Sequence, residues 1–141
     1  MRSFMPKPQQ PQLSIANVTR KAKEAEPADT VLVREVILSM ENDGSFYTRT
    51  LLPFQKNQVK HYRGANKSKY DEKGAETLWG RCYKLYAEQY AKDNDVPIQE
   101  ITAKANISLA ASILRKSFEA EADLGNYDEY LSKKDQAAYK K

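Results

Sequence analysis

The residues in this chain that are best able to bind a ligand are basic and aromatic, and they lie together between Phe46 and Tyr90. This stretch holds nine of the fourteen aromatic residues, and nine Lys and Arg against four Asp and Glu. The rest of the chain has fourteen basic and fifteen acidic residues, so the formal net charge of +4 arises in this stretch. Cations that hold phosphates and rings that stack on bases are the two requirements of a single-stranded nucleic-acid site.

The basic residues run from one predicted helix, through a loop, into the next helix. Lys56, Lys60 and Arg63 are spaced i, i+4, i+7 and therefore share one helical face. We expect five cations, called the basic track below, to hold phosphates: Lys56, Lys60, Arg63, Lys67 and Lys69. Four further cations would extend this track: Arg49, Lys73, Arg81 and Lys84.

Two tyrosines flank the loop of the basic track. We expect the rings of Tyr62 and Tyr70 to stack on bases. The alternative is that Tyr62 is a core residue and that Tyr70 packs at the start of the next helix.

A second aromatic set lies at helical spacing further along the chain: Trp79, Tyr83, Tyr86 and Tyr90. Next to it runs an apolar stripe of Leu78, Cys82 and Leu85. Together they form more apolar surface than one small neighbour can cover, and a soluble monomer rarely exposes so wide a patch. We therefore expect the four aromatic residues to form a homo-oligomer interface. The alternative is that they pack in the chain's own core, as aromatic stripes at helical spacing usually do.

Groups for catalysis or metal binding are scarce in this chain. It has one His and one Cys, whereas a structural zinc site needs about four such ligands. His61 and Cys82 lie on different predicted helices, and no glycine-rich phosphate-binding motif is present. Three acidic residues near residue 120 alternate along a predicted helix, so they do not converge on a metal. The sequence predicts no metal, no cofactor and no enzymatic activity.

The length and composition favour one compact domain with tails. The chain has 141 residues, and no run approaches the eighteen apolar residues of a membrane-spanning helix. Residues 1–12 lack the apolar core of a secretory signal, and a single cysteine fits a reducing compartment. We expect a cytoplasmic protein that does not contact a membrane.

The spacing of apolar residues predicts an all-α fold, a small bundle of about five helices. The helical domain is predicted over residues 13–125, between an extended, disordered Pro/Gln-rich arm (1–12) and a charged, weakly ordered tail (126–141). We expect Pro53 to kink the third helix and Asp71 to cap the fourth. The predicted helices span residues 13–25, 31–42, 45–62, 72–93 and 98–122, the last with a restart at Asn106.

Residues 31–42 are compatible with two structures. Leu32, Val33, Val36, Ile37 and Met40 lie on one helical face. A β-hairpin is the rival, because the segment is rich in β-branched residues and an Asp-Gly turn signal follows it. The cleaner helical spacing favours a helix, with Asp29 or Thr30 as its N-cap, Gly44 as a left-handed C-cap and Ser45 capping the next helix.

Several short motifs point to a resemblance. They are Glu41-Asn42-Asp43-Gly44, Tyr47, Pro53-x-x-Lys56-Asn57, Tyr70-Asp71, Ala75, Leu78-Trp79, Tyr90-Ala91-Lys92 and Ser117-Phe118-Glu119. Over about residues 31–120 they resemble a family of small helical accessory proteins of tailed bacteriophages, most without an assigned function. The chain departs from the family's pattern in a longer loop, Arg63 to Lys69, and a shorter turn, Asp93 to Pro97.

The resemblance implies a phage protein in the cytoplasm of a bacterial host. Some such proteins bind single-stranded DNA in replication or transcription, and others bind and disable host proteins. We therefore expect a non-enzymatic, oligomeric accessory protein that binds single-stranded nucleic acid. DNA is the first expectation and RNA the alternative.

The alternative is a host-directed inhibitor or adaptor that binds a host or phage protein. Its contact would be residues 1–12 or the aromatic residues of the 72–93 helix, since Tyr and Trp are typical hot spots. A small virion component is a third hypothesis.

Overall fold

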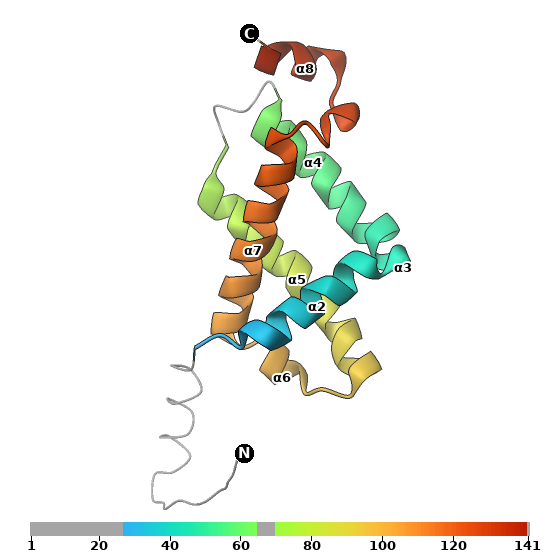
Figure 1. The fold of residues 1–141 in the computed structure, drawn as a ribbon, viewed down its shortest axis with the longest axis vertical. Helices are drawn as coiled ribbons and strands as arrows, with labels where there is room; N and C mark the ends of the chain where they lie inside the picture. Colours follow the sequence, from blue (N-terminus) through green and yellow to red (C-terminus); the bar gives the residue numbers. More distant parts are fainter. Residues whose placement is uncertain (1–26, 65–69, 141) are drawn as a thin grey trace, which may run out of the picture.

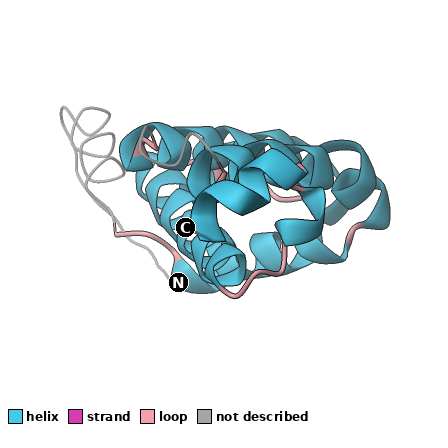
Figure 2. Ribbon diagram, turned by 90° about the horizontal axis from the view of Figure 1, so that it is seen from above, coloured by secondary structure: helices cyan, strands magenta, loops and turns pink. Residues whose placement is uncertain are grey.

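The computed structural model describes residues 27–64 and 70–140, and all secondary structure in these ranges is helical (Figure 2). The elements are α2 (Thr30–Asn42), α3 (Gly44–Phe46), the π-helical turn η1 (Tyr47–Leu51), α4 (Leu52–Arg63), α5 (Glu72–Asn94), α6 (Ile98–Ile101), α7 (Lys104–Asp123), the 3-10 turn η3 (Asp128–Tyr130) and α8 (Lys133–Lys140). The all-α prediction is confirmed for this part of the chain. The arm over residues 1–12 and the helix predicted over 13–25 lie outside the described residues.

The two longest helices, α5 and α7, form the centre of the fold and run antiparallel. Near the start of α5, Glu76 contacts Arg115 in the second half of α7, whereas Gly80 lies against Ile107 and Ala111 in its first half. The short helix α6 connects the pair. Helices α2 and α4 pack against it from one side, and α8 lies beside α4 at the C-terminal end of the chain (Figure 1).

Helix α2 forms where the sequence also allowed a hairpin. Asp29 caps it, because its Oδ1 accepts a hydrogen bond from the Leu32 amide at 3.1 Å. Its inward face is buried against α5 and α7, and consists of Val33, Val36, Ile37 and Met40. Burying one complete helical face outweighs the strand preference of branched residues. The hairpin alternative is therefore wrong.

The turn after α2 is capped by Asp43, and not by the two residues that follow it. Asp43 Oδ1 accepts a hydrogen bond from the Phe46 amide at 3.0 Å, and Oδ2 accepts one from Gln89 at 2.7 Å. The hydrogen bond from Phe46 lowers the pKa of this carboxyl. Gly44 is the first residue of α3, so the predicted left-handed cap at Gly44 and the predicted cap at Ser45 are wrong.

The predicted kink at Pro53 is seen as a change of helix type: the 45–62 segment consists of the end of α3, the π-helical turn η1 and most of α4. Pro53 occupies the first turn of α4, where a missing amide hydrogen costs least. In a regular α-helix its ring would crowd the carbonyl four residues earlier, at Arg49. The preceding turn is instead π-helical, with the Leu52 amide bonded to the Tyr47 carbonyl.

The helical domain extends past residue 125, where it was predicted to end. Gly125 turns the chain with a φ of +83°, which suits glycine. The Tyr127 ring then stacks on Phe118 with centroids 5.2 Å apart, and Leu131 is buried in the core. Residues 127–131 therefore belong to the packed domain, and α8 follows them in the predicted tail.

Gly80 allows α5 and α7 to approach each other. A Cβ atom at this position would lie 3.3 Å from Ile107 Cγ2 and 3.5 Å from Ala111 Cβ. We predict that Gly80→Leu lowers the free energy of unfolding by about 1–3 kcal/mol, because the added atoms overpack this contact. Urea denaturation of the purified variant measures the change.

Gly44→Leu is the matched control, since a Cβ at Gly44 meets no atom within 4 Å. We expect it to change the free energy of unfolding by less than about 0.5 kcal/mol. Equal effects of the two substitutions would show that α5 and α7 do not need a small residue at their contact.

Candidate nucleic-acid interface

Two cations of the basic track contact the C-terminal segment of the same chain. Lys56 Nζ lies 5.0 Å from the centroid of the Tyr130 ring, in a cation–π contact. Arg63 Nε donates a hydrogen bond to Asp128 Oδ1 at 2.9 Å. A phosphate at Arg63 would have to compete with this carboxylate. Arg49 and Lys60 are exposed, whereas Lys67 and Lys69 lie outside the described residues.

The two tyrosines predicted to stack on bases lie next to each other. The rings of Tyr62 and Tyr70 meet edge to face with centroids 5.0 Å apart. Tyr62 donates a hydrogen bond to Asp123 Oδ1 at 2.9 Å, and Tyr70 donates one to Glu119 Oε2 at 2.7 Å. Burial and the hydrogen bond to Asp123 raise the pKa of Tyr62 to about 12. Both rings are thus anchored to α7 by their hydroxyls, and base stacking stays a prediction.

A buried arginine on α7 holds the carboxylates near this tyrosine pair. Arg115 is 7% exposed, and its Nε donates a hydrogen bond to Glu76 Oε1 at 2.9 Å. Its Nη1 donates to both carboxylate oxygens of Glu119 at 2.9 Å and lies 3.5 Å from Glu72 Oε2. Sequence reasoning missed Arg115, although it continues the inward spacing of Ile107 and Ala111, because arginine is mostly an exposed residue. Its role is to neutralise acidic residues at the start of α5.

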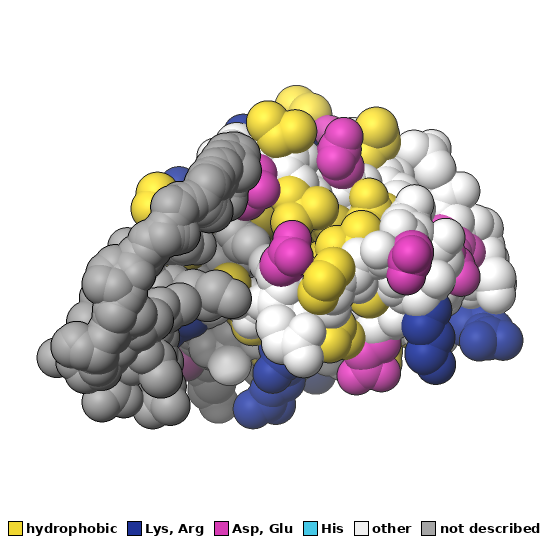
Figure 3. Space-filling view, turned by 90° about the horizontal axis from the view of Figure 1, so that it is seen from below, with side chains coloured by type: hydrophobic (Ala, Val, Ile, Leu, Met, Phe, Trp, Pro, Cys, Tyr) yellow, Lys and Arg dark blue, Asp and Glu magenta, His cyan; other side chains and the backbone are white. Residues whose placement is uncertain are grey.

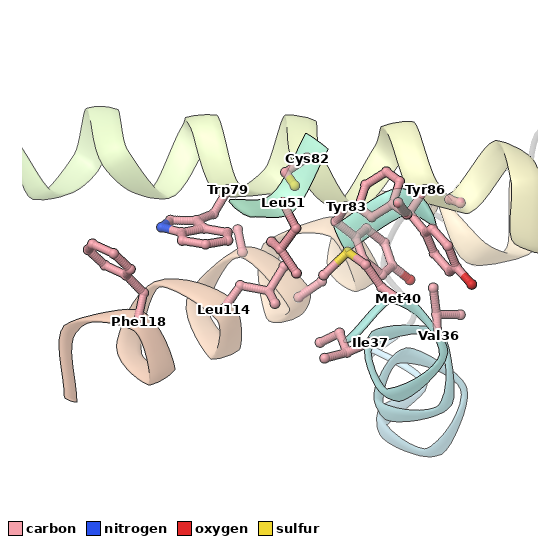
Figure 4. Close-up of a cluster of buried hydrophobic side chains, with 14 of the residues drawn as sticks. Val36, Ile37, Met40, Leu51, Trp79, Cys82, Tyr83, Tyr86, Leu114 and Phe118 are labelled. Atoms are coloured by element: carbon pink, nitrogen blue, oxygen red, sulfur yellow. The ribbon is translucent and has the colours of Figure 1, made fainter. Parts of the chain in front are cut away.

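Three of the four aromatic residues predicted at an oligomer interface lie in the chain's own core (Figure 4). Trp79, Tyr83 and Tyr86 are at most 3% exposed. Tyr83 donates a hydrogen bond to the Ile101 carbonyl at 3.2 Å, and the Tyr86 hydroxyl is bonded to Ser39 Oγ at 2.6 Å.

The fourth residue, Tyr90, packs at the edge of this core. The chain's own helices cover the stripe, so the exposed aromatic surface that motivated the interface is absent from the described part of the fold. Homo-oligomerisation stays a prediction, and these buried rings do not support it.

Two adjoining grooves cross the outer face of α5. The first lies between the end of α4 and the start of α5, and His61, Tyr70 and Leu78 line it. The second lies between α5 and α7, has a volume of about 600 Å³, and is lined by residues that include Lys73, Lys84 and Ser108. Thr77 and Arg81 line both grooves, so the two are adjacent.

The second groove has a cationic wall. Lys73, Arg81 and Lys84 are all exposed and span roughly 16 Å along α5. The acidic residue in this groove, Glu76, is already bound to Arg115. The structure therefore brings together three cations that the sequence placed only at the margin of the basic track.

The described residues offer little for other chemistry. Cys82 is buried in the core, and burial raises the pKa of its thiol to about 11, whereas His61 is exposed. Among residues 27–64 and 70–140, no three His, Cys, Asp or Glu side chains gather as metal ligands would. No helix in these ranges has the length and apolar character needed to cross a membrane.

Comparisons with known protein families, with curated proteins and with solved structures find no match to this chain. The likeness to tailed-phage accessory proteins therefore rests on the short sequence motifs alone.

Arg115 provides a stability test of this region. We predict that Arg115→Met lowers the free energy of unfolding by about 2–3 kcal/mol, because it removes the cation that neutralises Glu76 and Glu119 and leaves Glu119 with only the hydroxyl of Tyr70. Breaking a buried ion pair costs about 3–5 kcal/mol, and the partial exposure of the carboxylates reduces the effect. Chemical denaturation measures it against Lys116→Met, an exposed neighbour expected to change stability by less than about 0.5 kcal/mol. Equal stability of the two variants would contradict the assigned role of Arg115.

Proposed function

We propose that this protein binds single-stranded nucleic acid, DNA foremost, without catalysing a reaction, and that the strand lies along the two adjoining grooves of α5. The observation that supports this proposal is the cationic wall of the second groove, formed by Lys73, Arg81 and Lys84. Such side chains attract the phosphates of a strand and release the counterions bound to it.

The first groove supplies a surface of the kind that bases need. Tyr70 offers part of an aromatic ring there, and Leu78 is 37% exposed beside it. Unpaired bases gain contact with such rings, whereas the bases of a duplex are already stacked. The proposal therefore includes a preference for single strands over duplex.

Of the basic-track residues on α4, only Lys60 has a direct role in this proposal. Lys60 is exposed and precedes His61, which lines the first groove, so a strand leaving that groove can reach it. Lys56 and Arg63 would contribute only by exchanging their contacts with Tyr130 and Asp128.

The groove proposal predicts the salt dependence of binding. A triple variant Lys73→Gln, Arg81→Gln, Lys84→Gln should bind a labelled single-stranded DNA oligomer more weakly at low salt. The slope of log K against log salt should fall by about 2, because each lost phosphate contact on a single strand contributes about 0.7. Fluorescence anisotropy over a salt series measures both quantities, and circular dichroism checks that the variant is folded.

The matched control removes the same charge elsewhere: Arg34→Gln, Lys92→Gln, Lys116→Gln. These three cations are exposed and line neither groove. We expect the control to keep the wild-type slope. If both triple variants lost the same affinity and slope, the effect would be due to net charge and not to the groove. Binding by the unmodified protein that does not depend on salt would contradict the proposal.

Protein binding is the second candidate function, and exposed apolar residues favour it. Val31 and Leu38 on α2 are 69% and 61% exposed, and Leu85 on α5 is 53% exposed. The face in Figure 3 shows hydrophobic side chains gathered at its centre, with Lys and Arg at its lower edge. In the host cytoplasm implied by the phage resemblance, the partner would be a host or phage protein of replication or transcription.

Deleting residues 1–12 separates the two functions. If this segment docks a protein, the truncated chain should lose that partner in a pull-down from host lysate and keep its affinity for single-stranded DNA. Anisotropy and the pull-down are run on the same preparation. A loss of DNA affinity would instead assign residues 1–12 to the nucleic-acid site.

A further inference from the structure

A cavity on the opposite side of α5 from the grooves has a different lining from theirs. Its volume is about 220 Å³, and none of its lining residues lines either groove. It lies where α2, α4, α5, α7 and the segment after α7 meet. Its polar lining comes from Glu41, Gln55, Trp79, Ser117, Glu121 and Tyr127.

The indole of Trp79 supplies an unused hydrogen-bond donor to this cavity. Trp79 is 1% exposed, and its Nε1 has no hydrogen-bond partner among the described residues. The nitrogen lies at the end of the ring nearest Phe118, which also lines the cavity (Figure 4). Buried donors in proteins almost always have a partner. A ligand in this cavity would satisfy the donor if it carried an acceptor atom.

The cavity is negatively charged. Glu41 and Glu121 line it at its exposed edge, where Glu121 also accepts a hydrogen bond from Asn126 at 2.6 Å, and no Lys, Arg or His is among its lining residues. Burial raises the pKa of the Glu41 carboxyl, because the charged form is partly removed from water. Burial, together with the charges of Glu121 and Glu41, also raises the pKa of Tyr127 to about 12. The negative charges of both carboxylates therefore reach the Tyr127 hydroxyl, and both would stabilise a cation in the cavity beside it.

Three aromatic rings, together with Leu51 and Leu114, form much of the remaining wall. Phe118 contacts both Trp79 and Tyr127, with ring centroids 5.6 Å and 5.2 Å away, respectively. Aromatic rings attract organic cations through the negative potential of their π faces. Rings combined with carboxylates favour an ammonium group over a metal ion, which would need several oxygen ligands at close range.

The volume limits the size of the ligand. Space of about 220 Å³ corresponds to roughly seven water molecules, and it is smaller than the cavities that hold drug-sized ligands. The space therefore suits a small ligand better than a nucleotide or a peptide, and the two carboxylates disfavour an anion. A small organic cation does fit.

We propose that this cavity binds a small organic cation with a neutral oxygen acceptor, of the amino-alcohol class. The ammonium group lies against Glu41, Glu121 and the aromatic wall. The hydroxyl oxygen accepts the hydrogen bond of Trp79 Nε1. This inference does not depend on nucleic-acid binding, because the two sites share no residue.

Choline is the probe, and the chain reports on its own site because Trp79 is its single tryptophan. In ¹⁵N-labelled full-length protein, the one indole N–H signal should move downfield and saturate as choline is added, since a new acceptor deshields the proton. The neutral isostere 3,3-dimethylbutan-1-ol should bind at least about tenfold more weakly. Tetramethylammonium should bind without the downfield shift, because it has no oxygen.

Glu41→Gln should weaken choline binding up to about fivefold by calorimetry, because it removes one carboxylate from the cavity. Glu35→Gln on the same helix is the matched control, since Glu35 is exposed and does not line the cavity. The proposal is overturned if choline leaves the indole signal and the heat of mixing unchanged. It is equally overturned if the neutral isostere binds as tightly as choline, or if the two variants bind alike.

Discussion

The antiparallel contact between α5 and α7 is the constraint on which the rest of the structure depends. At one position a glycine lets the helices approach, because a larger residue at Gly80 would meet Ile107 and Ala111. Towards the other end of the contact, Arg115 binds carboxylates of both helices. Buried ion pairs contribute little net stability, but they penalise any register that leaves a charge unpaired. Small residues thus set the distance between the helices, and the arginine sets their register.

This helix pair also separates two surfaces of opposite charge. On the outer face of α5, Glu76 is bound to Arg115, which leaves Lys73, Arg81 and Lys84 as the exposed charges along the groove. On the inner face, two carboxylates and the indole of Trp79 line a small cavity. The ligand proposed for the outer surface is a polyanion, and the ligand proposed for the inner cavity is a small cation. The two proposed sites share no residue, so the two ligands would not compete.

Much of the fold could be predicted because it follows from local chemistry. The helical face of α2 and the break at Pro53 are visible in residue spacing and in the geometry of proline. The predicted caps at Gly44 and Ser45 were wrong because Asp43 has a carboxylate that reaches the free amide of Phe46 and also accepts from Gln89, 46 residues away. The packing beyond residue 125 was not visible in the sequence for a similar reason, since Tyr127 packs on Phe118 only after the chain has turned at Gly125.

The sequence by itself determined where the main helices lie, which residues face inward on α2 and α7, and that the excess of positive charge belongs to residues 46–90. Only the tertiary structure decided which cations share a groove, that Lys56 and Arg63 contact the C-terminal segment, and that Trp79, Tyr83 and Tyr86 are core residues. The physical reason is that periodicity reports which side chains share one face of one helix. It does not report how many neighbours cover that face, and that number decides whether a ring is buried or exposed and whether a charge is paired or available to a ligand.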